Sequence, residues 1–144
     1  ESGLVRFLGG TGQHDPRILL YAVENWPVDS VLMPVNPAEA VLGGFLDRVM
    51  PAAMDRGLAV IGMKVLGASH YISPQHGVTA ELLLRFALSQ QISTAIVGCS
   101  SPAEVVGLAK AGRDFQPLPE AEEKMLLETF RPHARRLAYY RGAY

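Results

Sequence analysis

The stretch that decides the fold is TAIVGCSSPAEVVGLAKAG, residues 94–112. It opens with a short apolar run, passes through a glycine and two serines, and continues with apolar residues at helical spacing. This order predicts a strand, a tight turn and a helix that begins at Ser101-Pro102, because serine is a favoured N-cap and proline a favoured first helical residue. Backbone N–H groups at a helix start attract anions, so the turn raises the question of a phosphate site.

The same strand-and-helix unit recurs along the whole chain. Four runs rich in Val, Ile, Leu and Phe are too short for helices and predict strands at 4–9, 30–35, 58–67 and 93–98. The runs are continuously apolar and do not alternate, which predicts strands covered on both faces. Helices are predicted at 15–25, 36–57, 79–90, 101–112 and 119–137.

Glycine and proline residues are expected to end or break these helices. Gly57 and Gly112 stand where a helix C-terminus favours a left-handed residue. Pro132 is expected to break or kink the last helix. The alternating order predicts an α/β fold with a parallel sheet and right-handed crossovers. Two architectures fit it: an open doubly wound sheet, or half of a TIM-type eight-stranded βα barrel with an added C-terminal helix, since a whole barrel needs about 250 residues.

Composition narrows the functional classes. The 144 residues are 49% hydrophobic and form one domain, 1–144, with a net charge of −1. This charge gives no case for nucleic acid or for an anionic membrane surface. The single cysteine, Cys99, excludes an internal disulfide and a cysteine-cluster metal site, and we expect no metal. No apolar run approaches the roughly 18 residues of a membrane span, and residues 1–10 lack a signal-peptide pattern, so we expect a cytoplasmic protein.

Four sequence pieces, in this order, resemble barrel strands five to eight of the aldo/keto reductases, the C-terminal half of that fold. They are VRFLGGTGQHDP, VDSVLMPVN, GLAVIGMKVLG and AIVGCSSPAEV. The pair GMKVLG and IVGCSSP is most similar to a bacterial branch whose strand ends in Met-Lys-x-Leu-Gly. The resemblance implies NAD(P)H-dependent reduction of an aldehyde or ketone. The family's catalytic Asp, Tyr, Lys and His come from its first four strands, so no residue here is assigned a catalytic role. The small carbonyl substrate is expected only together with the missing half.

The resemblance also assigns a cofactor site. Its residues are Thr11 near the nicotinamide amide, Lys64, Leu66 and Gly67 in a loop around the pyrophosphate, and Gly98, Cys99, Ser100 and Ser101 at the adenosine phosphate. Glu104 stands where NADP-preferring members carry Arg, which favours NAD over NADP.

Other positions depart from the family's pattern. Gly12 and Leu32 lack the side chains that hold the nicotinamide amide, and Met63 stands where a ring often stacks. Gly107 and Leu108 replace a common Glu-Asn pair at the adenine. The pyrophosphate half of the site is therefore expected to be better kept than the adenine end.

Ordinary structural roles compete with these assignments. Ser101 with Glu104 is spaced like a capping box, as is Asn36 with Glu39. Lys64 fits equally well an ordinary solvent-exposed lysine in the loop that follows its strand. Cys99 is expected to be a small buried turn residue and no nucleophile, and a lone His14 is expected to hydrogen-bond within its loop.

Two other functional classes stay open. One is a non-catalytic half-barrel that binds a dinucleotide or is purely structural. The other is an unrelated doubly wound protein that binds a phosphate at GCSSP. A half-barrel has two open sheet edges and an uncovered apolar interior, which predicts a homo-oligomer or association with an N-terminal half.

Overall fold

The structure, a computed structural model, describes residues 3–142. Its centre is a four-stranded parallel sheet in the order β1-β2-β3-β4. The strands are β1 (Gly9–Thr11), β2 (Ser30–Pro34), β3 (Ala59–Met63) and β4 (Thr94–Ala95). Consecutive strands lie side by side and run in one direction, so each connection crosses over the sheet through helical segments. The predicted parallel α/β fold is confirmed.

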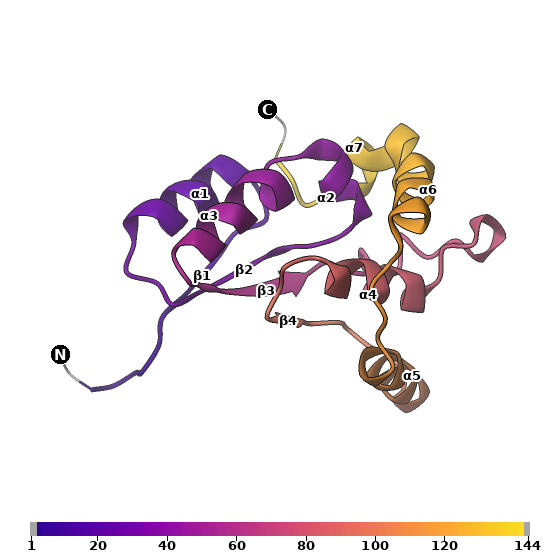
Figure 1. Ribbon diagram of the computed structural model, residues 1–144, viewed down its shortest axis with the longest axis horizontal. Coiled ribbons are helices and arrows are strands. Elements are labelled where there is room, and N and C mark those ends of the chain that lie inside the picture. The colour runs from indigo at the N-terminus through magenta and orange to yellow at the C-terminus, as the bar shows by residue number, and fades with distance from the viewer. Residues whose placement is uncertain (1–2, 143–144) are drawn as a thin grey trace.

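Helices fill the three connections and continue after the last strand (Figure 1). The first two connections hold α1 (Pro16–Asn25), then α2 (Pro37–Leu42), the π-helix Phe45–Val49 and α3 (Met50–Asp55). The third holds the 3₁₀ turn Pro74–His76 and α4 (Ala80–Ser89). After β4 come α5 (Pro102–Arg113), α6 (Glu120–Phe130), the 3₁₀ turn Arg131–His133 and α7 (Ala134–Leu137). In the described residues, no helix has both the length and the apolar character needed to cross a membrane.

The helix starts follow the predicted chemistry. Four of the helices begin at a capping side chain that accepts a hydrogen bond from a backbone N–H two or three residues further on. These caps are Asp15, Asn36, Thr79 and Ser101. The break at Pro132 is also confirmed, because the chain passes into a 3₁₀ turn there.

Two helix predictions are wrong at glycines. The predicted helix 36–57 is interrupted at Gly43 and Gly44, which have φ values of 74° and 100°. Pro16 packs so closely against Gly44 that a Cβ there would overlap its ring. Gly112 does not end its helix, because α5 continues to Arg113. Gly57 does adopt the predicted left-handed conformation, with a φ of 69°.

All four strands are shorter than predicted. The run 30–35 forms β2 without its last residue, and the run 58–67 forms a strand only at Ala59–Met63, as β3. Of the run 4–9 only Gly9 belongs to a strand, since pairing begins with the Leu8 carbonyl, which accepts from the N–H groups of Asp29 and Ser30. Upstream of it the N-terminal segment runs away from the sheet (Figure 1). The last strand keeps only the two residues of β4.

One face of the sheet is covered and the other is not. Val31, Met33 and Val60 point to the covered face and are at most 1% exposed. They pack with side chains of α1, α3 and α4 in the hydrophobic core. The opposite face shows the row Thr11, Leu32, Ile61 and Thr94, whose members are half-buried or exposed. The prediction of strands covered on both faces is therefore wrong for this chain by itself.

Candidate functional site

The loops that follow the four strands meet at the carboxyl edge of the sheet. In parallel βα folds this edge carries the binding sites, because loops from several strands converge there. All of the predicted cofactor residues except Thr11, which ends β1, lie in these loops or at the start of α5.

A groove of about 430 Å³ opens between the loop after β3, the start of α4 and one side of α5. It brings three of the predicted residues together: Leu66, Gly98 and Glu104. Gly107 and Leu108, predicted at the adenine end, line the same groove. A Cβ at Gly98 would meet no atom within 4 Å, so the backbone is open here. The volume falls within the range of about 300–1,000 Å³ that holds small ligands.

The charge of the groove is one-sided. Of the described residues that line it, Glu81 and Glu104 are carboxylates and none is basic. The arrangement repels a phosphate group placed beside it and offers acceptors to hydroxyl groups.

The turn before α5 is closed by its own side chains. Ser101 Oγ accepts from the Glu104 N–H at 3.3 Å. Glu104 Oε2 accepts from the Ser100 N–H at 2.7 Å, one residue before the position of an ideal capping box. The predicted cap role of Glu104 is therefore confirmed with this shift. An anion that binds the Ser100 N–H must displace this carboxylate.

The loop after β3 is held in an unusual backbone conformation. Lys64, Ala68 and Ser69 all have left-handed φ values, of 56°, 52° and 69°. Such values are strained for residues with side chains, and such strain clusters at functional sites. Lys64 is half-buried, and its Nζ lies 5.8 Å from the centroid of the Tyr140 ring. It does not line the groove.

The remaining predicted residues lie apart from the groove. Thr11 Oγ1 donates to the Leu32 carbonyl at 3.3 Å, and Thr11 is exposed on β1. Cys99 is exposed, so its predicted burial is wrong, because the turn before α5 has no layer packed over it. It lines a separate hollow of about 390 Å³ beside α5. His14 does form a hydrogen bond, but not within its own loop: Nδ1 donates at 3.3 Å to the carbonyl of Tyr140, which lies 126 residues further along the chain.

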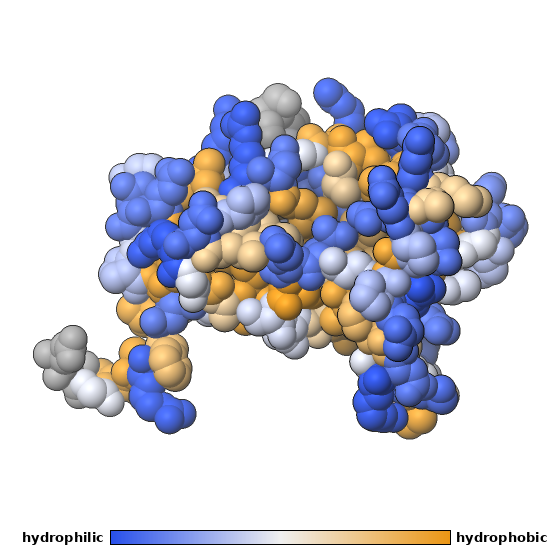
Figure 2. Space-filling view, viewed as in Figure 1, coloured by the Kyte–Doolittle hydropathy of each residue, from blue (hydrophilic) through white to orange (hydrophobic). Residues whose placement is uncertain are grey.

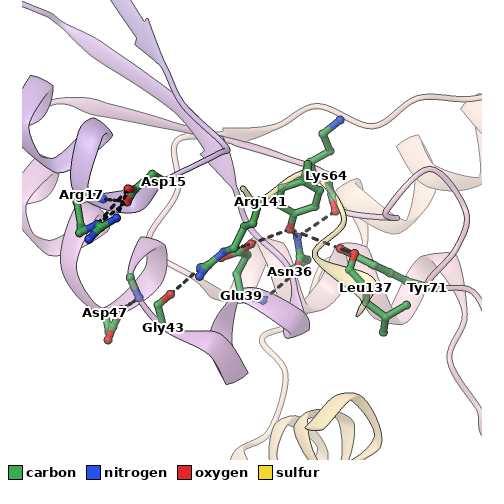
Figure 3. A network of polar contacts seen from close by, with 12 residues as sticks. Asp15, Arg17, Asn36, Glu39, Gly43, Asp47, Lys64, Tyr71, Leu137 and Arg141 are labelled. Carbon is green, nitrogen blue, oxygen red and sulfur yellow. Dashed lines mark hydrogen bonds and ion pairs between the residues drawn. The ribbon is translucent and has the colours of Figure 1, made fainter. Parts of the chain in front are cut away.

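A buried polar network at the same edge was not predicted (Figure 3). Glu39, in α2, is fully buried and accepts from the Tyr140 hydroxyl at 2.8 Å. Arg141 completes an ion pair with Glu39 and donates to the Gly43 carbonyl at 2.6 Å. Asn36 Nδ2 donates to the Tyr140 hydroxyl at 2.9 Å and to the Lys64 carbonyl at 3.2 Å. The C-terminal segment is thereby fastened across the ends of β2 and β3.

Burial controls the protonation of this network. Burial raises the pKa of Glu39, and the hydrogen bond and charge of Arg141 oppose that rise. Burial also raises the pKa of Tyr71 to about 12, and it raises that of Tyr140. Both phenols therefore stay neutral near pH 7 and serve as hydrogen-bond donors.

The capping box predicted for Asn36 and Glu39 forms only in part, because the Glu39 carboxylate does not take up its capping position. Asn36 Oδ1 accepts from the Glu39 N–H as expected, at 3.1 Å. The Glu39 carboxylate, however, turns away to the C-terminal segment. The signal in the sequence was the lone acid in the otherwise apolar helix PAEAVL, since a buried carboxylate needs a partner.

Comparison with known proteins bears on the fold. No family model and no curated protein matches this sequence. Among solved structures, the chain is similar to the aldo-keto reductase AKR11C1 from Bacillus halodurans in its holo form, with a TM-score of 0.63 and 17% identity over 99% of this chain and 53% of that one. The apo form of that protein gives a TM-score of 0.62 and 18% identity over 99% and 54%.

The fold matches half of an aldo-keto reductase barrel. Four parallel strands alternating with helices account for the match, and this chain spans about half the length of the solved structures it resembles. Of the two architectures open at the level of sequence, the half-barrel is the one supported. At this level of identity the likeness establishes the fold alone.

Proposed function

We propose that residues 1–144 form the C-terminal, dinucleotide-binding half of an aldo/keto reductase-type oxidoreductase, and that the groove takes the adenosine end of NAD. The observation that carries the proposal is the groove at the carboxyl edge of a half-barrel, where Leu66, Gly98 and Glu104 come together. Reduction of a small aldehyde or ketone would then belong to a barrel that includes the missing catalytic half.

The carboxylates of the groove favour NAD over NADP. Glu104 and Glu81 line it together, so a 2′-phosphate would be placed beside two negative charges. A free ribose diol instead donates hydrogen bonds to carboxylates, an interaction worth about 1.5–3 kcal/mol when one partner is charged. This difference corresponds to tens- to hundreds-fold weaker binding of NADP.

Cofactor binding also changes the partner of Glu104. The carboxylate that accepts from the Ser100 N–H in the free chain would move to the ribose hydroxyls. The N–H groups at the start of α5 would then become available to the pyrophosphate. Lys64, on the neighbouring loop, would need to leave the Tyr140 ring to assist.

Titration calorimetry with NAD and NADP tests the proposal on three proteins: the unchanged chain, Glu104→Arg and Glu104→Gln. We expect the unchanged chain to prefer NAD, Glu104→Arg to shift preference to NADP, and Glu104→Gln to lie between them. Each variant loses part of a helix cap worth about 1 kcal/mol, so affinities are compared at equal folded fraction. A preference of the unchanged chain for NADP would contradict the role given to Glu104.

A second candidate is a half-barrel with a structural role only. The observation that favours it is the hydrogen bond between Glu104 and the Ser100 N–H, since this closes the anion-binding turn with the chain's own carboxylate. Absence of binding by either cofactor, to all three proteins, would select this alternative and end the dinucleotide proposal.

A further inference from the structure

Three of the chain's four histidines gather around one pocket. His70, His76 and His133 line a pocket of about 500 Å³ between the loop after β3 and the stretch from α6 to α7. None of its lining residues lines the groove proposed for NAD. Figure 2 shows the molecule hollowed between the N-terminal segment and α5. The pocket lies away from this hollow, beside α6 and α7 (Figure 1), so it belongs neither to the cofactor groove nor to the open face of the sheet.

The floor of the pocket is apolar. Tyr71, Val78 and Phe130 line it and are buried parts of the hydrophobic core. The rings of Tyr71 and Phe130 meet edge to face, with their centroids 5.5 Å apart. The Tyr71 hydroxyl donates to the Leu137 carbonyl at 3.1 Å, so its polar end already has a partner. A ligand that reaches this floor gains affinity from an apolar body.

The rim of the pocket is polar and positively charged. The three histidines and Arg136 are exposed there. An imidazole offers at least one ring N–H donor whether it is neutral or charged, and a guanidinium is always charged. Glu128 is the lone acid in the described lining, and Arg131 pairs with it at 3.0 Å. Among residues 3–142 no carboxylate pairs with Arg136, so the rim attracts anions.

Two of the rim histidines are held in place by their neighbours. Ser73 Oγ and His76 Nδ1 share a hydrogen bond at 2.8 Å, and the Nε2 atom of His76 has no partner among the described residues. The turn that carries this pair is closed by two backbone hydrogen bonds between Ser73 and Val78, at 2.9 and 3.1 Å. The His70 ring stands edge-on to that of Tyr139, with the centroids 5.7 Å apart. A rim that is ordered beforehand loses less entropy when a ligand binds.

We propose that this pocket binds a small organic carboxylate with an apolar body, which goes beyond the function proposed above. The carboxylate pairs with the planar fork of Arg136 and accepts from the imidazoles, while the body lies on the apolar floor. The volume falls within the range of about 300–1,000 Å³ that holds small ligands. An inorganic anion would use the rim alone, and an uncharged apolar molecule would use the floor alone.

A titration followed by the NMR signals of the imidazole C–H groups tests the proposal at constant pH. The probes are phenylacetate, its uncharged amide phenylacetamide, and acetate, which has the charge without the body. We expect phenylacetate to shift the signals of the three pocket histidines with a dissociation constant at or below about 1 mM. The other two probes should bind at least about tenfold more weakly, since each lacks one half of the interaction. His14 does not line the pocket, so its signals serve as the internal control.

Two neighbouring arginines of α7 locate the site. Arg136→Gln should weaken phenylacetate binding at least about tenfold, because the charged partner of the carboxylate is lost. Arg135→Gln is the matched control, because Arg135 is also exposed on α7 but does not line the pocket. Circular dichroism shows whether both variants are folded, and the comparison of the three probes on the unchanged chain stands without them.

Three results would overturn the proposal. They are the absence of shifts in the pocket histidines up to about 10 mM phenylacetate, equal binding of phenylacetate and its amide, and equal effects of the two arginine substitutions. The titration contains no NAD, so its failure is separate from a failure of the proposed function.

Discussion

Gly67 shows how much a single residue contributes to the candidate site. It has a φ of 54°, and a Cβ there would overlap the ring of the buried Tyr71. Glycine is thus required for the fold of the loop after β3, whether or not a cofactor binds. Gly98 differs, because it has no left-handed φ and its added Cβ would meet no atom within 4 Å.

This contrast gives a stability prediction. Gly67→Ala should lower the free energy of unfolding by at least about 1–3 kcal/mol, the range for a strained backbone position. Gly98→Ala should change it by no more than about 0.5 kcal/mol, as at an ordinary surface site. Urea denaturation of the two variants and the unchanged chain measures both effects. Equal effects of the two substitutions would show that Tyr71 does not constrain the loop.

At the scale of elements, the C-terminal segment is held to α2 by a buried ion pair. Arg141 and Tyr140 satisfy Glu39, which is 0% exposed. Burial raises the pKa of Glu39 above its ordinary value of 4.5. The folded state therefore binds a proton at this carboxyl more tightly than the unfolded state does. The stability from that proton is complete below pH 4.5 and is lost as the pH rises through the folded-state pKa.

Glu39→Gln should remove this pH dependence. We expect the free energy of unfolding of the unchanged chain to fall, relative to that of Glu39→Gln, as the pH rises from about 4 to about 8. Urea denaturation across this range gives the difference, and Glu104→Gln, at an exposed carboxyl, serves as the control. A difference that stays constant or grows with pH would contradict the raised pKa.

The same elements show what a sequence can and cannot predict. Local chemistry set the caps at Asp15, Asn36 and Ser101, and the strand–helix alternation gave the parallel sheet. The partner of Glu39 could not be predicted, because Tyr140 lies 101 residues away and no local pattern links them. The resemblance placed Leu66, Gly98 and Glu104 in one cofactor site, and the three residues line one groove. The capping-box spacing predicted a backbone N–H partner for Glu104, but not that this partner is the N–H of Ser100.

At the scale of the whole molecule, the half-barrel has one face of its sheet covered by helices and the opposite face uncovered. The sequence predicted that both faces of the sheet are buried, because continuously apolar strands are typical of sheets covered on both faces. The sequence could not show whether this chain or another covers the second face of the sheet. The strand positions were predicted well for β2, too long for β3, which ends at Met63, and poorly for the edge strands β1 and β4.

The half-barrel alone should not reduce carbonyl compounds. The resemblance places the proton-donating tyrosine and its supporting Asp and Lys in strands that this chain does not contain. We expect no NADH or NADPH consumption with a panel of aldehydes and ketones. Turnover above about 1 s⁻¹, a low but ordinary enzyme rate, would show that catalytic groups lie within these 144 residues.

The pairing of Glu39 with the C-terminal segment bears on the order in which the chain is made. A ribosome delivers Glu39 about a hundred residues before Tyr140 and Arg141, at separations of 101 and 102. Until those two residues emerge, burying α2 would leave the carboxylate of Glu39 buried without the positive charge of Arg141. The nascent chain should therefore remain protease-sensitive around α2 until Arg141 has emerged from the ribosome, and then become resistant. Ribosome-stalled chains that expose residues up to Leu137 or up to Gly142 would show this difference, and equal resistance of the two would exclude it.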